Sequence, residues 1–225
     1  VGLANKFGAI FTKEIATAYP NSGLAGAKVV GNPLKAAIVD AAKQSDWKSA
    51  RAKAKSELGV VGDLILILGG STGSRAINEV ISNSNFGDST VIHSLGKNNQ
   101  IPPATDKYRP VSYIEDMATA LIAADLVISR SGAIACTEFA ALGKYALFIP
   151  LPIGNGEQAL NAASLIEEGR AELIEQKNFT STWLTENIDR LIQRSQEQSG
   201  QGNSEGVQAT AKIVALMNHA IGEGR

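Results

Sequence analysis

Short, wholly apolar runs recur along the chain, and most of them end at a glycine or a small polar residue. The clearest is 64–68, which holds five branched apolar residues in a row and no polar position. Apolar runs of this length without alternation are typical of strands that are buried on both faces of a parallel sheet. We expect further strands at 27–30, 90–95, 111–114, 125–129, 145–149 and 171–174.

Stretches with helix-forming composition stand between these runs. Asp46 and either Thr180 or Ser181 occupy positions of helix N-caps, and Gly59 and Gly143 follow the ends of expected helices. We expect helices at 34–42, 46–58, 75–82, 115–123, 133–142, 158–168, 180–196 and 207–221. The alternation of strands with helices predicts an α/β fold, with a parallel sheet that is covered by helices on both faces.

A glycine-rich loop at 69–74 directly follows the strand at 64–68 and precedes the helix at 75–82. The order of strand, glycine loop and helix is a pattern that holds phosphate groups on backbone N–H groups. The loop is not a Walker A loop, since no Gly-Lys-Ser/Thr follows, and it is not a full G-x-G-x-x-G. Two interpretations stay open: a phosphate loop, or a tight strand-to-helix turn that needs glycine for its backbone.

The stretch 125–161 combines a strand, a turn of small residues, a helix, a second strand and the start of another helix. In an α/β sheet, the loop after a strand and the start of the next helix border the ligand site. The free N–H groups near Ala133 and Ile134 would face an anion, and Glu138 would accept from ribose hydroxyls. The alternative is that Glu138 is a solvated helix residue. Arg130, in the turn, faces a phosphate or pairs with a carboxylate, and the sequence does not decide.

Composition narrows the class of protein. The 225 residues are 44% hydrophobic and 19% charged, with a net charge of −1, which is typical of a globular protein. The near-neutral charge argues against a surface for nucleic acid or anionic membrane. Cys136 is the only cysteine, so there is no disulfide framework and no cysteine spacing of a zinc site, and a reducing compartment fits. We interpret His93 and His219 as structural or surface residues, because neither has a partner at metal-ligand spacing.

The two ends of the chain carry no targeting signal that the sequence reveals. No apolar run approaches the roughly 18–20 residues that a membrane span needs, and no signal peptide is visible. The chain begins at Val1, within what reads as an ordered element. We therefore expect a piece of a longer protein, although a processed chain would begin in the same way.

Four stretches, taken in their order and spacing, are more specific than any single motif. They are VVGNPLK at 29–35, LGGSTGSRAIN at 68–78, the run from YIEDM to FIPLP at 113–152, and EQALNA at 157–162. Together they resemble the MurG family, bacterial transferases that add N-acetylglucosamine to a lipid-linked muramyl-pentapeptide. The resemblance covers nearly the whole chain and is to the C-terminal half of that family. It implies a Rossmann-like domain, the C-terminal domain of a GT-B glycosyltransferase.

The resemblance also implies roles for individual residues in binding UDP-N-acetylglucosamine. Glu138 matches the acidic residue that holds the ribose hydroxyls, and Ile114 matches the position whose backbone reads the uracil edge. Lys35 stands where the family usually has an arginine, so it offers phosphate a point charge in place of a planar fork. The helix start whose backbone contacts the donor diphosphate corresponds to Ala133, Ile134, Ala135, Cys136 and Thr137.

Three further residues complete the donor site that the resemblance implies. Ser71, in the glycine loop, matches a serine that contacts the donor. Gln158 matches the glutamine that contacts the sugar hydroxyls, and Asn161 lies one turn further on. The resemblance implies neither a metal ion nor a cofactor at this site.

For the chain as a whole, the resemblance implies inverting transfer of N-acetylglucosamine to the lipid-linked acceptor in peptidoglycan biosynthesis. We expect a single donor-binding domain over 1–225, with 1–26 as a linker from an N-terminal acceptor domain and 207–221 as a terminal helix. That acceptor domain would bind the lipid-linked partner and supply the general base, so we expect no catalytic residue in this chain. We expect no nucleic-acid partner. The full-length protein would be cytoplasmic and peripheral on the inner face of the bacterial plasma membrane.

Two alternatives stay open. The chain is the donor-binding subunit of a two-chain N-acetylglucosaminyltransferase, or it is a nucleotide-sugar-binding module without catalysis. The segment that precedes Lys28 argues against the first alternative. A glycine-rich motif ending in histidine, encoded upstream of Val1, would distinguish the half-enzyme from both.

Overall fold

A parallel six-stranded sheet forms the centre of the computed structural model, which describes residues 2–20, 22–70, 72–153, 156–199, 202 and 206–223. The strands lie in the order β5-β4-β3-β6-β7-β8, and every neighbouring pair is parallel. Their bounds, in that order, are Tyr108–Val111, Thr90–Ser94, Leu64–Leu68, Leu126–Ser129, Tyr145–Phe148 and Ala171–Leu173. The predicted parallel sheet is confirmed.

Strand β3 lies inside the sheet, and both of its faces are buried. Leu64, Leu66 and Leu68 belong to one apolar cluster, whereas Ile65 and Ile67 belong to the other. Side chains along a strand point alternately to the two faces, so an unbroken apolar run suits a strand with a core on each side. Burial of each such side chain contributes about 1.5–3 kcal/mol.

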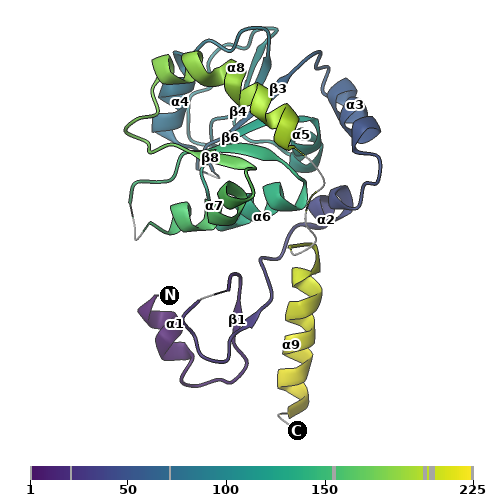
Figure 1. The fold of residues 1–225 in the computed structure, drawn as a ribbon, viewed down its shortest axis with the longest axis vertical. Coiled ribbons are helices and arrows are strands. Elements are labelled where there is room, and N and C mark those ends of the chain that lie inside the picture. The colour runs from purple at the N-terminus through teal and green to yellow at the C-terminus, as the bar shows by residue number, and fades with distance from the viewer. Residues whose placement is uncertain are drawn as a thin grey trace.

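Helices cover both faces of this sheet, as Figure 1 shows. One apolar cluster takes residues from α2 (Ala36–Ala42), α3 (Trp47–Glu57), α5 (Met117–Ala123), α6 (Ala133–Ala141) and α7 (Glu157–Glu167). The cluster on the opposite face takes residues from α4 (Arg75–Ser82) and α8 (Ser181–Gln198). The prediction that helices pack on both faces is therefore confirmed.

Side-chain caps begin several of these helices. The side chains that accept an N–H of the first turn belong to Asp46, Ser74, Asp116 and Thr180. Asp46 and Thr180 confirm two caps that the sequence predicted. Helix α6 begins differently, because its N-cap is Gly132 and no side chain caps it. Its first N–H groups therefore keep their hydrogen-bonding capacity for another partner.

One predicted strand is wrong. We expected a strand at 111–114 after a loop over 96–109, whereas β5 is Tyr108–Val111 and Ile114 lies beyond it. Pro110 makes this segment read as a loop, because proline has no N–H for a sheet ladder. Proline is tolerated on edge strands, and β5 is the outermost strand beside β4. The other expected elements have ends within two residues of the prediction, and those of β3 and α4 agree with it.

His93 is a buried structural residue, as we expected. Its Nδ1 lies 2.9 Å from the Tyr108 hydroxyl, and its Nε2 lies 3.1 Å from Asn78 Oδ1. Asn78 Nδ2 donates to the Leu95 carbonyl at 3.1 Å, so Nε2 of the histidine donates to the amide oxygen and Nδ1 accepts from tyrosine. Burial lowers the pKa of His93 to about 4, so the ring is neutral at pH 7.

The N-terminal segment and the last helix lie to one side of the six-stranded sheet (Figure 1). The elements concerned are α1, β1, β2 and α9, with bounds Leu3–Gly8, Ala16–Thr17, Lys28–Val29 and Ala209–Glu223. β1 and β2 form a separate parallel pair. Glu14 connects β2 with α9, because its carboxylate lies 2.8 Å from Lys28 Nζ and 3.3 Å from His219 Nδ1. Within the described ranges, no helix combines the length and apolar character of a membrane span.

Candidate functional site

The central pair of the sheet, β3 and β6, is where the direction of strand order reverses. From β3 the chain proceeds outward through β4 and β5, whereas from β6 it proceeds the opposite way through β7 and β8. In open α/β sheets, ligands bind in the crevice outside the carboxyl ends of the strands at such a switch point. Leu68 and Ser129 are paired at these ends, so the glycine loop and the start of α6 lie side by side.

The glycine loop at 69–74 has a packing reason for two of its glycines. A Cβ on Gly69 would lie 2.6 Å from the backbone nitrogen of Ser74, and one on Gly73 would overlap the carbonyl oxygen of Leu95. Gly73 also has φ +79°, a left-handed conformation that favours glycine. A tight turn therefore accounts for these two residues without a phosphate. Ser71, our expected donor contact, lies outside the described residues.

The first turn of α6 is an uncapped helix terminus, of the kind that suits an anion. Gly132 provides no capping side chain, and the turn holds no acidic residue that would fill the place of an anion. The N–H of Cys136 already donates to the Gly132 carbonyl at 3.0 Å, so the unused N–H groups belong to the residues before it. Ala133, Ile134 and Ala135 therefore present the positive end of the helix dipole to the carboxyl edge of the sheet.

Cys136 and Thr137 face away from this open terminus through their side chains. The Cys136 thiol is buried in the core, and burial raises its pKa to about 12. Thr137 Oγ1 donates to the Ala133 carbonyl at 2.9 Å and accepts from Asn32 Nδ2 at 3.0 Å. The N–H of Cys136 is also engaged, so the backbone contact with the diphosphate that the resemblance implies for these two residues stays a prediction.

Glu138 occupies a half-buried position one and a half turns into α6. Burial raises the pKa of its carboxyl group, and the positive charge of Lys35 acts in the opposite direction. Lys35 is exposed at the start of α2, so a mobile cation and a partly desolvated carboxylate stand near each other. Half-burial weighs against the alternative of a fully solvated Glu138, and it strengthens any hydrogen bond that the carboxylate accepts.

Gln158 and Asn161 hold neighbouring backbone segments in this structure. Gln158 Oε1 accepts from the N–H of Leu151 at 2.9 Å, and Asn161 Nδ2 donates to the Ser131 carbonyl at 3.1 Å. The second bond ties α7 to the turn that precedes α6. Asn161 thus contacts the turn that leads into α6, and the sugar contacts expected of both residues stay a prediction.

Ile114 lies between β5, at one edge of the sheet, and α5. Its side chain is buried in the same apolar cluster as β3, between the end of β5 and the cap of α5. Only its backbone is therefore able to read a base, as the resemblance implies.

The sequence left the role of Arg130 open, and the structure gives its guanidinium four acceptors in the protein. Its Nη1 donates to the carbonyls of Ile149 and Pro150 at 2.9 and 3.0 Å. Its Nη2 donates to Ser74 Oγ at 2.7 Å and to Gln176 Oε1 at 2.6 Å. The guanidinium therefore joins the loops that follow β3, β7 and β8 to its own loop after β6.

Two contact residues were missed by the sequence reasoning. Asn32 Nδ2 lies 3.4 Å from the Tyr19 hydroxyl, and that hydroxyl lies 3.5 Å from the Ala133 carbonyl oxygen. Both residues belong to segments that precede the sheet domain, yet they contact the first turn of α6. Asn32 belongs to the Gly-Asn-Pro motif at 31–33, which could have marked it as a candidate, whereas no local pattern singled out Tyr19.

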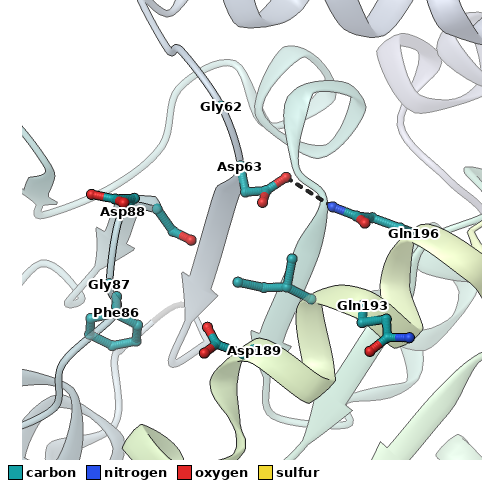
Figure 2. A pocket seen from close by; sticks show the side chains of 10 residues that line it. Gly62, Asp63, Phe86, Gly87, Asp88, Asp189, Gln193 and Gln196 are labelled. Atoms are coloured by element: carbon teal, nitrogen blue, oxygen red, sulfur yellow. Dashed lines mark hydrogen bonds between the residues drawn. The ribbon is translucent and has the colours of Figure 1, made fainter.

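A hollow of about 510 Å³ lies at the opposite edge of the sheet, between the starts of β3 and β4 and helix α8. Figure 2 shows Asp63, Asp88 and Asp189 around it, with a hydrogen bond of 3.3 Å from Gln196 Nε2 to Asp63 Oδ1. Three carboxylates repel a diphosphate. This hollow is therefore a poor candidate for the nucleotide.

Comparisons with known proteins identify the family of this chain. The family model described as "Glycosyltransferase family 28 C-terminal domain" matches residues 64–216 of this chain. A relative from Saccharopolyspora erythraea is 37% identical over 95% of this chain and 59% of its own length. One from Corynebacterium diphtheriae is 41% identical over 79% of this chain and 50% of its own. Both are named UDP-N-acetylglucosamine--N-acetylmuramyl-(pentapeptide) pyrophosphoryl-undecaprenol N-acetylglucosamine transferase, and this chain spans less than two thirds of either.

Solved structures with the same fold include MurG from Acinetobacter baumannii, with a TM-score of 0.67 at 25% identity over 97% of this chain and 64% of that one. The calicheamicin glycosyltransferase CalG4 has a TM-score of 0.56 at 16% identity, over 87% of this chain and 49% of its own, which shows the fold alone. The sheet is thus the Rossmann-like C-terminal domain of a GT-B glycosyltransferase. Because the family match spans more than half of the chain, this protein belongs to glycosyltransferase family 28 and carries its C-terminal domain.

Proposed function

We propose that the chain is the donor-binding half of an inverting N-acetylglucosaminyltransferase. Its donor would be UDP-N-acetylglucosamine, and its acceptor the lipid-linked muramyl-pentapeptide of peptidoglycan biosynthesis. The observation that carries the proposal is the uncapped terminus of α6 at the switch point, with Glu138 further along the same helix. The printed names of the relatives supply the sugar and the acceptor.

The donor diphosphate would lie on the N–H groups of Ala133, Ile134 and Ala135. The helix dipole favours negative charge there, and backbone donors suit phosphate oxygens. Lys35 adds a mobile positive charge from the start of α2, close enough to act on the Glu138 carboxyl group. Ser71 would contact the donor from the glycine loop.

The nucleoside and the sugar would occupy the two sides of that helix. Glu138 would accept hydrogen bonds from both ribose hydroxyls, and the backbone of Ile114 would read the uracil edge. Gln158 and Asn161 would meet the sugar hydroxyls. Gln158 Oε1 holds the N–H of Leu151, so sugar binding would use its amide nitrogen or replace that bond.

Departure of UDP from the sugar places negative charge on the diphosphate. Fixed N–H groups at the start of α6 stabilise that charge without a large reorganisation of the site. The acceptor hydroxyl needs a general base, and we assign that role to no residue of this chain. We assign the base and the acceptor site to an N-terminal domain, to which 1–26 would be the link, and the whole enzyme would act at the inner face of the plasma membrane.

Titration calorimetry of this chain with UDP, UDP-N-acetylglucosamine, ADP and NAD tests the proposal. We expect uridine nucleotides to bind with an affinity in the micromolar range, about −8 kcal/mol, because only half of the cleft is present. Adenine nucleotides should bind more weakly, since Ile114 would read the uracil edge. Equal or tighter binding of ADP or NAD would contradict the proposal.

A further inference from the structure

Arg130 is a buried cation without an ionic partner among the described residues. Arg130 is only 8% exposed. Its guanidinium donates to two backbone carbonyls, one hydroxyl and one amide oxygen. Arg190 makes the contrast clear, since both of its Nη atoms donate to the carboxylate of Glu172 at 2.6 and 2.9 Å. A buried charge without a counter-charge is costly even when its hydrogen bonds are made.

The helices near Arg130 add to this positive charge. Ser74, which accepts from Arg130 Nη2, is the N-cap of α4. The N-cap of α6, Gly132, follows Arg130 by two residues. Helix N-termini carry partial positive charge, so both helices raise the local potential further.

Lys144 shows the usual solution for a buried cation. It is fully buried, and its Nζ donates at 2.9 Å to the carbonyls of Ile122 and Ala124 at the carboxyl end of α5. A helix carboxyl end is the negative pole, and Asp125 adds a negative charge nearby, so both offset the charge of Lys144, whose pKa burial lowers to about 7. Arg130 lies near the opposite kind of helix end, where the helix dipoles do not compensate its charge.

We propose that Arg130 is a positioning residue for the donor diphosphate, which ties four loops into one rim and supplies a fixed, unpaired positive charge behind the terminus of α6. The inference rests on the proposed function, because the diphosphate is the anion that it assigns to this edge. The charge acts through space on the bound anion, since all four guanidinium bonds are already with the protein. A purely structural Arg130 would tie the same loops and leave the anion unaffected.

The variant Gln176→Glu separates the two roles. Glutamate has the shape of glutamine, so it keeps an oxygen at the position that accepts from Arg130 Nη2 at 2.6 Å. It also gives the guanidinium a carboxylate partner. The carboxylate neutralises the charge of Arg130 and keeps the hydrogen bond between residues 130 and 176. We expect affinity for UDP to fall about tenfold, affinity for uridine to stay within about twofold, and the melting temperature to rise or stay unchanged.

Gln193→Glu is the matched control. Gln193 is exposed on α8 and lines the hollow at the opposite edge of the sheet, so this change adds the same charge far from Arg130. It should leave UDP affinity within about twofold of wild type, because exposed charges that far apart are screened. An equal loss of UDP affinity in both variants would show an effect of net charge and overturn the inference.

Two variants of Arg130 itself provide a second test. Arg130→Lys keeps the positive charge but lacks the planar guanidinium group. Arg130→Met removes the charge and keeps much of the apolar part of the side chain. Among folded proteins, we expect Arg130→Lys to bind UDP more tightly than Arg130→Met, with similar uridine affinity in both. Equal UDP affinity in the two variants contradicts the inference.

The outcomes also separate this inference from the proposed function. If wild type binds neither UDP nor uridine, the proposed function fails. If wild type binds both and Gln176→Glu binds UDP as tightly as wild type, the inference alone is wrong. A loss of uridine affinity equal to the loss of UDP affinity would indicate distortion of the whole site and would also overturn it.

Discussion

Asn32 Nδ2 lies 3.0 Å from Thr137 Oγ1, and this contact joins the segment ahead of α2 to the first turns of α6. Thr137 Oγ1 in turn donates to the Ala133 carbonyl, so the hydroxyl is both donor and acceptor. On its other side, a Cβ on Gly206 would lie 2.5 Å from Thr137 Cγ2. The helix that we propose to hold the donor is therefore packed between the segments that lead into and out of the sheet domain.

The variant Thr137→Val tests that contact, because valine keeps the shape and Cγ2 of threonine but removes the hydroxyl. Loss of one part-buried hydrogen bond should lower the free energy of unfolding by about 1 kcal/mol. Hydrogen exchange should become faster in 16–35 and stay unchanged in β3, which is remote from Thr137. Unchanged exchange in 16–35 would show that the contact does not hold this segment.

The variant Glu138→Gln tests the ribose contact. A charged acceptor of two hydroxyls is worth roughly 1.5–3 kcal/mol, so UDP and uridine should both bind about tenfold to a hundredfold more weakly. A 2′,3′-dideoxy analogue should bind wild type and variant equally. Glu79→Gln, on the exposed side of α4, is the matched control and should change nothing. Wild-type UDP affinity in folded Glu138→Gln would rule out the ribose assignment.

The variant Lys35→Ala should give the opposite pattern. Its proposed partner is phosphate, so UDP should bind several-fold more weakly whereas uridine should bind as it does to wild type. Lys35 is exposed and caps no helix through its side chain, so stability should change by under about 0.5 kcal/mol. Lys48→Ala on α3 serves as the control for the loss of one surface charge. Weaker uridine binding in Lys35→Ala would contradict the assignment of Lys35 to the phosphate groups.

His93 should make stability depend on pH. Its pKa is about 4 in the folded protein, against about 6.5 for an unperturbed histidine, so the unfolded chain takes up a proton first as pH falls. His93 therefore contributes stability that is complete above pH 6.5 and is lost as pH falls toward 4. The loss is about 3 kcal/mol.

Urea unfolding at pH 4.5, 5.5 and 7 measures this effect. His93→Gln should be less stable than wild type at pH 7 and should lose less further stability on acidification, because it lacks the titrating ring. Parallel pH profiles for the two proteins would show that His93 is not the group responsible.

Local patterns predicted those parts of the fold that local physics determines. The limits of β3 and α4 agree with the sequence, because an unbroken apolar run and a Ser74 cap need no distant partner. β5 was missed because only its place at the sheet edge makes Pro110 acceptable. That place depends on pairing with β4, which the segment itself does not encode.

The sequence suggested a position for the candidate site, whereas the contacts around that position were harder to predict. The start of α6 and Glu138 stood out as a helix terminus after a buried strand. Arg130 stayed ambiguous because Ser74 and Gln176, its acceptors, are 56 and 46 positions away in sequence. Asn32 and Thr137 are 105 positions apart, and only the folded chain brings them together.

The most direct test of the account is a backbone amide NMR titration of this chain with UDP-N-acetylglucosamine. We predict that the largest chemical-shift changes occur at Ala133, Ile134 and Ala135, whose N–H groups would meet the diphosphate, with further changes at Ile114. The amides of Asp63 and Asp88, beside the acidic hollow, should not shift (Figure 2). Saturable shifts at the hollow with none at the start of α6 would contradict the account.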